Sequence, residues 1–159
     1  MDFIIDKTVP EDWEQVRLIY SQGILSGNAT FETSLPSWEQ WDAAHREEPR
    51  LSARCGDEVL GWAALSPVSS RKVYAGVAEV SIYIRAEARG RKVGSALLAA
   101  LIARSEEAGI WTLQATIFPE NQASLALHQK FDFRVVGRRE RIAQLNGVWH
   151  DTILLERRK

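Results

Sequence analysis

Cysteine and methionine are nearly absent from this sequence, which has one of each among 159 residues. The single Cys55 has no partner for an internal disulfide, so the chain is not a disulfide-stapled scaffold. The start, Met1 to Asp6, has neither a basic n-region nor a long apolar segment, and no apolar run reaches the length that crosses a bilayer. We therefore expect a reduced, soluble, cytoplasmic protein.

The sequence also lacks an excess of either charge. Its 20 Lys and Arg residues nearly balance 21 Asp and Glu residues, which gives a net charge of -1. A nucleic-acid footprint over the whole surface is therefore not expected, and positive charge should matter only locally. No membrane partner and no metal site are predicted. The length suits one hydrophobic core, so residues 1–159 are expected to form a single domain.

Apolar periodicity predicts a mixed α/β domain. Local signals are a capping box at Thr8 and Glu11, a helix N-cap at Ser37, a helix C-cap at Gly109 and a hairpin turn at Gly56-Asp57. The expected order is β-α-α-β-β-β-α-β-α-β-β. Strands are expected at 3–5, 51–56, 58–66, from 78, 113–117, 133–141 and 148–156, and helices at 13–24, 37–48, from 93, and 121–130.

Residues 79–95 carry the most specific local signal. Alternating apolar residues stop after Ile84 at a basic turn with two glycines, and a helical apolar period begins at Val93. The first amides of a helix lack internal partners and carry the positive end of its dipole, so they form a seat for a phosphate or pyrophosphate. Glycine lets the backbone approach such a ligand closely. The basic residues expected at the same place are Arg85, Arg89, Arg91 and Lys92.

An anion seat alone does not name the ligand. The chain has no Gly-Lys-Ser/Thr phosphate loop and no Gly-x-Gly-x-x-Gly spacing with an acidic residue about twenty positions further on. Nucleotide binding of the kinase or dehydrogenase type is therefore not predicted.

Two partial motifs resemble those of the GNAT superfamily of N-acetyltransferases. Its cofactor signature is Arg or Gln, two residues, Gly, one residue, then Gly or Ala. Arg89 to Gly94 match it, except that Lys92 replaces the middle glycine. The second signature is Asn, a small residue, Leu-aromatic and then Gly-Phe. Asp132 stands where its glycine is usual, and the matching residues are Asn121, Ser124, Leu127, His128 and Phe133.

Within the superfamily, the chain is most similar to the phosphinothricin and methionine-sulfoximine N-acetyltransferase group, over residues 29–33, 78–84, 121–128 and 147–151. The resemblance implies the GNAT fold: a central mixed, mostly antiparallel sheet with splayed cofactor-binding strands, flanked by helices. It also implies a homodimer. Some members of the group have a second candidate catalytic histidine where this chain has Leu145 or Asn146.

The resemblance implies acetyl-CoA as co-substrate, with its pyrophosphate on the amides of Gly90 to Ser95 and its pantetheine arm along Ile82 to Ile84. A splayed strand end leaves N–H and C=O groups free for the amides of that arm, and a free N–H near Ile82 would serve as an oxyanion donor. The predicted cofactor residues are Ile82, Tyr83, Ile84, Arg89, Gly90, Arg91, Lys92, Val93, Gly94, Ser95 and Asn121.

An amine must lose a proton before it attacks a thioester, so the site needs a base. Glu79 opens the cofactor strand between two apolar neighbours, and partial burial would strengthen it as the general base. His128 stands where many superfamily members have a tyrosine that protonates the departing thiolate, so it is the candidate acid, with Tyr83 as a weaker one. A solvated carboxylate and a packing histidine are the alternatives.

For the substrate, the resemblance implies an amino-acid pocket in which Arg71 binds the carboxylate in two-pronged fashion. The alternative is that Arg71 and Lys72 are solvated loop charges. The predicted substrate residues are Phe31, Glu32, Arg71, Lys72, Val73, Tyr74, Glu79, Val80 and Ser81.

The predicted activity is transfer of acetyl from acetyl-CoA to the α-amino group of a small amino acid or analogue, such as phosphinothricin, methionine sulfoximine or methionine sulfone. One alternative is a GNAT enzyme that acetylates a polyamine, an aminoglycoside or a protein N-terminus. The other is a CoA-binding module without catalysis. An acidic pocket would favour a polycation, whereas Arg71 and Lys72 facing inward would favour a carboxylate.

Overall fold

The computed structural model describes residues 2–159. The strands are β1 (Ile4–Lys7), β2 (Arg50–Cys55), β3 (Glu58–Pro67), β4 (Val77–Ile84), β5 (Thr112–Ile117), β6 (Arg134–Leu145) and β7 (Val148–Arg158), and the helices are α1 (Trp13–Ser26), α2 (Trp38–Ala44), α3 (Val93–Glu107) and α4 (Gln122–Lys130). The strands form one sheet in the order β1-β2-β3-β4-β5-β7-β6. Within residues 2–159, only β4 and β5 are parallel neighbours. The predicted element order and the mixed, mostly antiparallel sheet are therefore confirmed.

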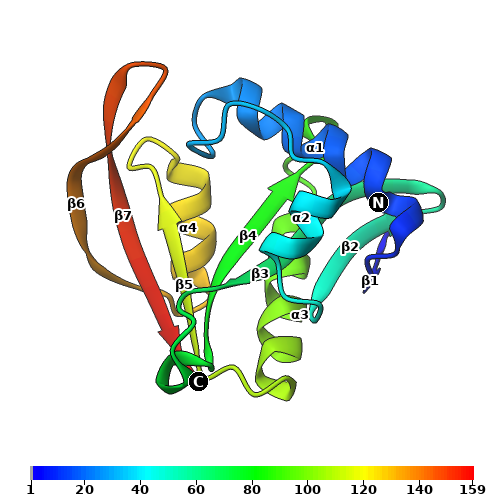
Figure 1. Cartoon of the computed structure of the whole chain (residues 1–159). Helices are drawn as coiled ribbons and strands as arrows, with labels where there is room; N and C mark the ends of the chain where they lie inside the picture. The colour runs from blue at the N-terminus through cyan, green and yellow to red at the C-terminus, as the bar shows by residue number, and fades with distance from the viewer. Residues whose placement is uncertain (1) are drawn as a thin grey trace.

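Helices cover both faces of the sheet (Figure 1). The larger core packs α3 against the sheet, and Leu97, Leu98 and Leu101 of α3 are fully buried there. A second core lies under α1 and α2 and is mostly aromatic, with Trp41 and Trp62 at its centre. Alternation along β4 assigns Ala78 and Val80 to the first core and Tyr83 to the second. No helix within residues 2–159 is long and apolar enough to cross a bilayer.

The helix ends test the local sequence signals. Ser37 caps α2 as predicted: its Oγ accepts a hydrogen bond from the Gln40 amide at 3.1 Å, and Gln40 Oε1 accepts one from the Ser37 amide at 2.9 Å. Gly109 follows α3 with a left-handed φ of 86°, which confirms the expected C-cap region. The capping box at Thr8 and Glu11 is wrong, because Thr8 Oγ1 pairs with Ser52 Oγ at 2.8 Å.

A buried carboxylate takes the place of that capping box. Asp12 is 5% exposed, and its Oδ2 accepts hydrogen bonds from the Val9 amide at 2.8 Å and from Arg54 Nη2 at 2.7 Å. The N-terminal turn is therefore fixed to β2. This contact joins residues far apart in the sequence, so local sequence patterns do not predict it. Helix α2 is also shorter than predicted. It ends at Ala44, because the Arg46 amide donates to the Leu65 carbonyl at 2.7 Å and draws the chain onto β3.

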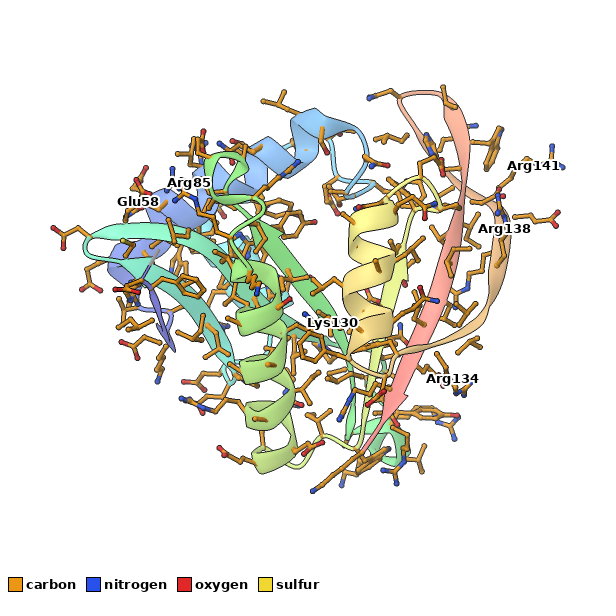
Figure 2. All side chains as sticks on the ribbon, turned by 180° about the vertical axis from the view of Figure 1, so that it is seen from behind. Glu58, Arg85, Lys130, Arg134, Arg138 and Arg141 are labelled. Atoms are coloured by element: carbon orange, nitrogen blue, oxygen red, sulfur yellow. The ribbon has the colours of Figure 1, made fainter. Side chains whose placement is uncertain are left out.

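Arginines line the outer strand of the sheet. Arg138 of β6 pairs with Asp151 at 2.7 Å, and Arg134 pairs with Glu156 at 3.0 Å. Figure 2 shows them along the β6–β7 hairpin with Arg141. Charge on an edge strand discourages pairing with another sheet. The hairpin turns at Asn146-Gly147, both with positive φ, so the Leu145 or Asn146 position noted above lies at a tight turn.

The sheet opens between β4 and β5. Their pairing ends at Glu79 opposite Gln114, while β4 stays paired with β3 as far as Ile84. The Arg85 amide donates to the Leu60 carbonyl, so odd-numbered residues of β4 bond to β3. The N–H and C=O groups of Val80, Ile82 and Ile84 therefore face the opening, as expected for splayed strands.

Candidate active site

Two cavities meet at this opening. The central cavity, of about 410 Å³, lies between loop 29–32 and the diverging strands. The α3 cavity, of about 380 Å³, lies between the end of β4 and the start of α3. Both cavities are lined by Ala29, Ile82, Tyr83, Asn121 and Ser124. A ligand seated along α3 can therefore extend into the central cavity.

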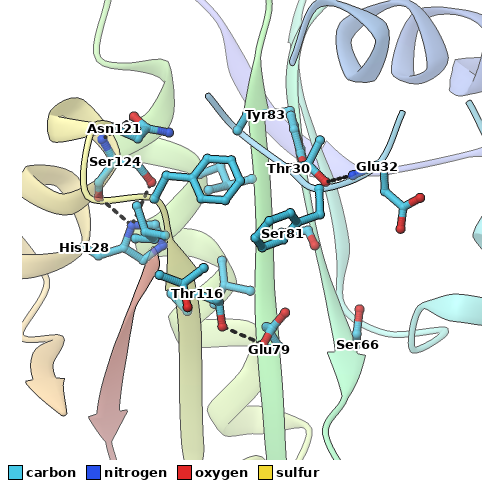
Figure 3. A pocket seen from close by; sticks show the side chains of 18 of the residues that line it. Thr30, Glu32, Ser66, Glu79, Ser81, Tyr83, Thr116, Asn121, Ser124 and His128 are labelled. Atoms are coloured by element: carbon cyan, nitrogen blue, oxygen red, sulfur yellow. Dashed lines mark hydrogen bonds between the residues drawn. The ribbon is translucent and has the colours of Figure 1, made fainter. Parts of the chain in front are cut away.

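Glu79 lies at the point where β4 and β5 diverge. Its Oε1 accepts hydrogen bonds from Gln114 Nε2 at 2.7 Å and from Thr116 Oγ1 at 3.2 Å, both on β5. Figure 3 shows its carboxylate beside Thr116 at the base of the central cavity. Oε2 has no hydrogen-bond partner within residues 2–159. The carboxylate is therefore held by one oxygen, and the other is available to a ligand in the cavity.

The start of α3 has the geometry of an anion seat. Helical hydrogen bonding begins with the Ala96 amide, so the amides of Val93, Gly94 and Ser95 have no partner within the helix. Lys92 precedes them with a left-handed φ of 64°. A Cβ on Gly94 would lie 3.3 Å from Leu127, which leaves little room for a side chain. This geometry suits a phosphate held by backbone amides.

The predicted cofactor residues line the α3 cavity with one exception, Arg91. Arg85 does not contribute to the seat. Its guanidinium donates to the Val59 carbonyl at 2.8 Å and to Gln15 Oε1 at 3.0 Å, which fixes α1 to β3. Lys130, absent from the sequence-based list, donates to Ser95 Oγ at 3.3 Å and supplies positive charge at the seat.

Asn121 joins the two cavities. As N-cap of α4, its Oδ1 accepts from the Ser124 amide at 3.2 Å, and its Nδ2 donates to the Asn28 carbonyl at 3.2 Å. The side chain thus fixes the loop after α1 to the start of α4. Its place on the shared wall is where the arm of a ligand would pass from one cavity to the other.

His128 is 2% exposed, and its Nδ1 lies 2.7 Å from the Ser124 carbonyl oxygen. A carbonyl only accepts, so Nδ1 carries the ring proton and Nε2 of the neutral ring has none. Burial lowers the pKa of His128, so the neutral form prevails near pH 7. In this tautomer Nε2, buried and without a partner within residues 2–159, is an acceptor, so the geometry does not favour the expected role as proton donor, which stays a prediction.

Tyr83, the weaker acid candidate, packs as expected. Its ring stacks on Trp62 with centroids 5.0 Å apart and lies 4.9 Å from Tyr20. Burial, together with Tyr20, raises the pKa of Tyr83 well above its ordinary value. The phenol keeps its proton at neutral pH and is a poor acid.

The predicted substrate residues fall into two sets. Phe31, Glu32, Glu79, Val80 and Ser81 line the central cavity, whereas residues 71–74 lie outside it. Arg71 is exposed, and its guanidinium lies 5.6 Å from the Tyr74 ring centroid. No Lys or Arg of residues 2–159 lines the cavity. Its only acidic residues are Glu32 and Glu79, so the cavity within one chain is acidic.

The comparison with known proteins decides the family. A model of the acetyltransferase (GNAT) family matches residues 13–133. The chain belongs to the GNAT family. It is 29% identical to the phosphinothricin N-acetyltransferase of Streptomyces coelicolor, over 94% of this chain and 92% of that protein. It is 33% identical to the L-methionine sulfoximine/L-methionine sulfone acetyltransferase of Pseudomonas paraeruginosa, over 67% of this chain and 62% of that protein.

A solved GNAT structure carries the co-substrate. The phosphinothricin acetyltransferase from Sinorhizobium meliloti in complex with AcCoA has a TM-score of 0.89 and 29% identity, with 99% of this chain and 89% of that chain covered. The seat at α3, the close approach at Gly94 and the free edge of β4 fit the same molecule here. This GNAT protein is therefore an acetyl-CoA-dependent N-acetyltransferase, and the module without catalysis is set aside.

Several residues of this GNAT site were missed from the sequence. Gln114 and Thr116 alternate with apolar Leu113, Ala115 and Ile117, so a polar face on β5 was visible, but its meeting with Glu79 was not. His150 stacks on Phe118 with ring centroids 5.1 Å apart, while Trp149 is 55% exposed. No group of three His, Cys, Asp or Glu side chains within residues 2–159 is arranged to hold a metal ion.

Proposed function

We propose that this enzyme acetylates the α-amino group of a small amino acid or analogue, such as phosphinothricin, methionine sulfoximine or methionine sulfone, with Glu79 as the general base. The observation that carries the proposal is the position of Glu79 at the divergence of β4 and β5, within the cavity that continues into the α3 seat. The names of the relatives support the substrate class. Residues 1–159 would act as one catalytic domain, in the cytoplasm, where acetyl-CoA is made available.

Acetyl-CoA supplies an activated acetyl group as a thioester. The amides of Val93 to Ser95 would bind its pyrophosphate, and the free groups of Ile82 and Ile84 would bind its pantetheine arm. The Ile82 N–H would donate a hydrogen bond to the thioester carbonyl oxygen. Removal of one such donor costs about 3 to 4 kcal/mol of transition-state stabilisation in other acyl-transfer enzymes.

Glu79 would take a proton from the substrate ammonium through its free Oε2, and the amine nitrogen would then attack the carbonyl carbon as the carbon–sulfur bond breaks. A thiol has a pKa of about 8.5, so its thiolate leaves readily. Through cavity water it takes up the second proton that the attacking nitrogen loses. No dedicated acid is needed, and His128 would accept a hydrogen bond within the site.

A second candidate substrate is an amine without a carboxylate, such as a polyamine. It is favoured by the charge of the central cavity, which Glu32 and Glu79 line and no cation of the same chain lines. A carboxylate placed there would meet like charge, whereas a second ammonium group would be attracted. The two candidates therefore differ in whether Arg71 reaches the cavity of an assembled enzyme.

We also propose that the enzyme is a homodimer in which the loop with Arg71 completes the pocket of the partner. This loop is apolar as well as charged, since Val68, Val73, Tyr74 and Trp111 are 39% to 64% exposed around it. Exposed apolar side chains gathered at one place are typical of an interaction surface. Docking of a second copy there would bury them and give the pocket the cation that it lacks.

The deciding experiment follows free-thiol release from acetyl-CoA with L-methionine sulfoximine, L-methionine sulfone, phosphinothricin, ordinary amino acids, spermidine and an aminoglycoside. Turnover of the sulfoximine class with a kcat reduced about 10² to 10⁴-fold by Glu79→Gln supports the proposal. Gln114→Ala is the control, because it removes a hydrogen bond to the Glu79 carboxylate and keeps the base itself. A smaller fall in kcat is expected. Turnover of spermidine alone would favour the second candidate.

Mixed dimers test the shared pocket. Arg71→Ala should raise KM for the amino acid and leave KM for acetyl-CoA unchanged. If Arg71 acts across the interface, refolding Glu79→Gln together with Arg71→Ala chains restores activity, because one pocket of each hybrid has both residues. A monomer in light scattering would count against the dimer, and a mixture without restored activity would count against the shared pocket.

A further inference from the structure

The acetylation of an ammonium substrate releases one net proton. The substrate nitrogen gives up two protons, and the CoA thiol keeps one of them. The other proton reaches Glu79 and must leave before the next turnover. The site therefore needs a route by which the proton passes from the base to solvent.

His45 at the end of α2 has a free acceptor nitrogen near that base. Its Nδ1 lies 2.7 Å from the Trp41 carbonyl oxygen, so Nδ1 carries the proton. Nε2 then has a lone pair, and it has no hydrogen-bond partner within residues 2–159. The ring is held by Trp41, with centroids 4.4 Å apart, and by the edge of Trp62.

Backbone pairing brings His45 close to Glu79. The Arg46 amide donates to the Leu65 carbonyl, which fixes His45 beside the end of β3. The next residue of β3, Ser66, pairs across the sheet with Glu79. His45, Ser66 and Glu79 all line the central cavity, and Figure 3 shows the last two side by side on neighbouring strands. The Ser66 hydroxyl makes no hydrogen bond within residues 2–159.

His45 also lines two further cavities. One, of about 370 Å³, lies under loop 34–36 and α2. The other, of about 500 Å³, is lined by exposed residues including Lys7, Asp42 and Glu47. The imidazole is therefore a shared wall of the central cavity and of a cavity that is lined by exposed residues.

The surroundings of His45 keep its ring neutral, with a lone pair on Nε2. Burial is the main cause that lowers the pKa of His45, and Arg50 adds to it, so the ring is neutral near pH 7. Arg50 is itself paired with Asp42 at 2.6 Å. The other charged or titratable groups around the ring are Tyr20, Glu32, Glu79, Tyr83 and His128 in the central cavity, Tyr20 and Glu32 again in the cavity under loop 34–36, and Lys7 and Glu47 in the third cavity.

We propose that His45 is the residue that transfers the proton from Glu79 to solvent. The proton taken by Glu79 passes through cavity water to the Ser66 hydroxyl, which gives its own proton to Nε2 of His45. The imidazolium releases the proton to solvent through the third cavity, and Ser66 is again a hydroxyl at the end of the cycle. This inference rests on the proposed role of Glu79, and His45 acts through that base without touching the substrate.

The test compares His45→Asn with the parent enzyme in thiol release from acetyl-CoA, with the best amine of the panel above. Asparagine keeps a donor for the Trp41 carbonyl and has nothing at the Nε2 position. We expect kcat to fall about 10 to 100-fold in dilute buffer, with KM for acetyl-CoA unchanged, and to recover as imidazole is added. Ser66→Ala should lower kcat less, and His45→Gln serves if His45→Asn does not fold.

The outcomes separate this inference from the proposed function. An unchanged kcat in His45→Asn, or a loss that imidazole does not restore, would overturn the relay and indicate a packing role. A kcat unaffected by Glu79→Gln, or no turnover of any amine, would overturn the proposed base and the relay with it. We expect added imidazole to restore kcat in His45→Asn but not in Glu79→Gln.

Discussion

Two residues in left-handed backbone conformation explain how the chain departs from the glycine pattern of its family. Lys92 has a φ of 64° and Asp132 a φ of 68°, and both stand where the GNAT motifs usually have glycine. The backbone therefore keeps the shape that glycine favours, and the side chains pay a steric penalty of about 1 to 2 kcal/mol at most. The departures change side-chain chemistry and leave the loop geometry intact.

The first prediction concerns Lys92. Lys92→Gly should change the free energy of unfolding by less than about 1 kcal/mol, because relief of strain is offset by the greater freedom of the unfolded chain. Lys92→Val should lower it by roughly 1 to 2 kcal/mol, because a β-branched residue fits this φ poorly. Both variants lack the charge of Lys92. The difference between their free energies of unfolding therefore reports the effect of the backbone conformation at residue 92.

Urea unfolding and acetyl-CoA titration measure the two effects. We expect Lys92→Val to bind acetyl-CoA more weakly than Lys92→Gly, because valine shifts the amides of the α3 seat. Equal stability and equal affinity of the two variants would show that the left-handed φ at residue 92 does not matter.

At the scale of elements, the packing of α1 against β4 depends on one small residue. A Cβ on Gly23 would lie 2.7 Å from two ring carbons of Tyr83, which is closer than side chains approach. Tyr83 lines both cavities, so the contact links the position of a helix to the shape of the site. The sequence shows this glycine within an amphipathic helix and does not show what it faces.

Gly23→Ala should therefore lower the free energy of unfolding by about 1 to 3 kcal/mol through overpacking, even though alanine is the better helix former. It should also lower kcat/KM, because the Tyr83 ring moves. Gly137→Ala is the matched control, since a Cβ there meets nothing within 4 Å. A stabilised Gly23→Ala protein in urea unfolding would contradict the close contact.

At the scale of the whole molecule, local patterns were enough for the elements but not for the site. The strand, loop and helix of residues 79–101 follow from periodicity within one segment, and the order of the elements agrees with the structure. The partners of Glu79 on β5 depend on the register of a parallel pair separated by α3. The bonds of Arg85 to Val59 and Gln15 likewise join distant segments.

The same limit explains the wrong details. The capping box at Thr8 fitted the adjacent residues, yet the buried pair of Asp12 and Arg54 decides how the turn is held. His128 could be found as a motif position, whereas its tautomer follows from the Ser124 carbonyl one turn earlier in α4. Motif spacing identifies which residues gather, and only the fold shows which atom of each is free.

The two buried histidines make the stability of the molecule depend on pH. Burial lowers the pKa of both His45 and His128 below the usual value of about 6.5. Between the lowered folded value and 6.5, the unfolded chain binds more protons than the folded one. The free energy of unfolding therefore rises with pH in this window and falls as the solution is acidified.

Urea unfolding at a series of pH values between about 7 and 5 measures this slope, which each histidine raises by up to about 1.4 kcal/mol per pH unit. Gln in place of either ring should flatten the dependence, and the double variant His45→Gln/His128→Gln should lose most of it. The slope is the informative quantity, because Gln at a buried position lowers stability at every pH. An unchanged slope in the double variant would show that these two histidines do not cause the acid sensitivity between pH 7 and 5.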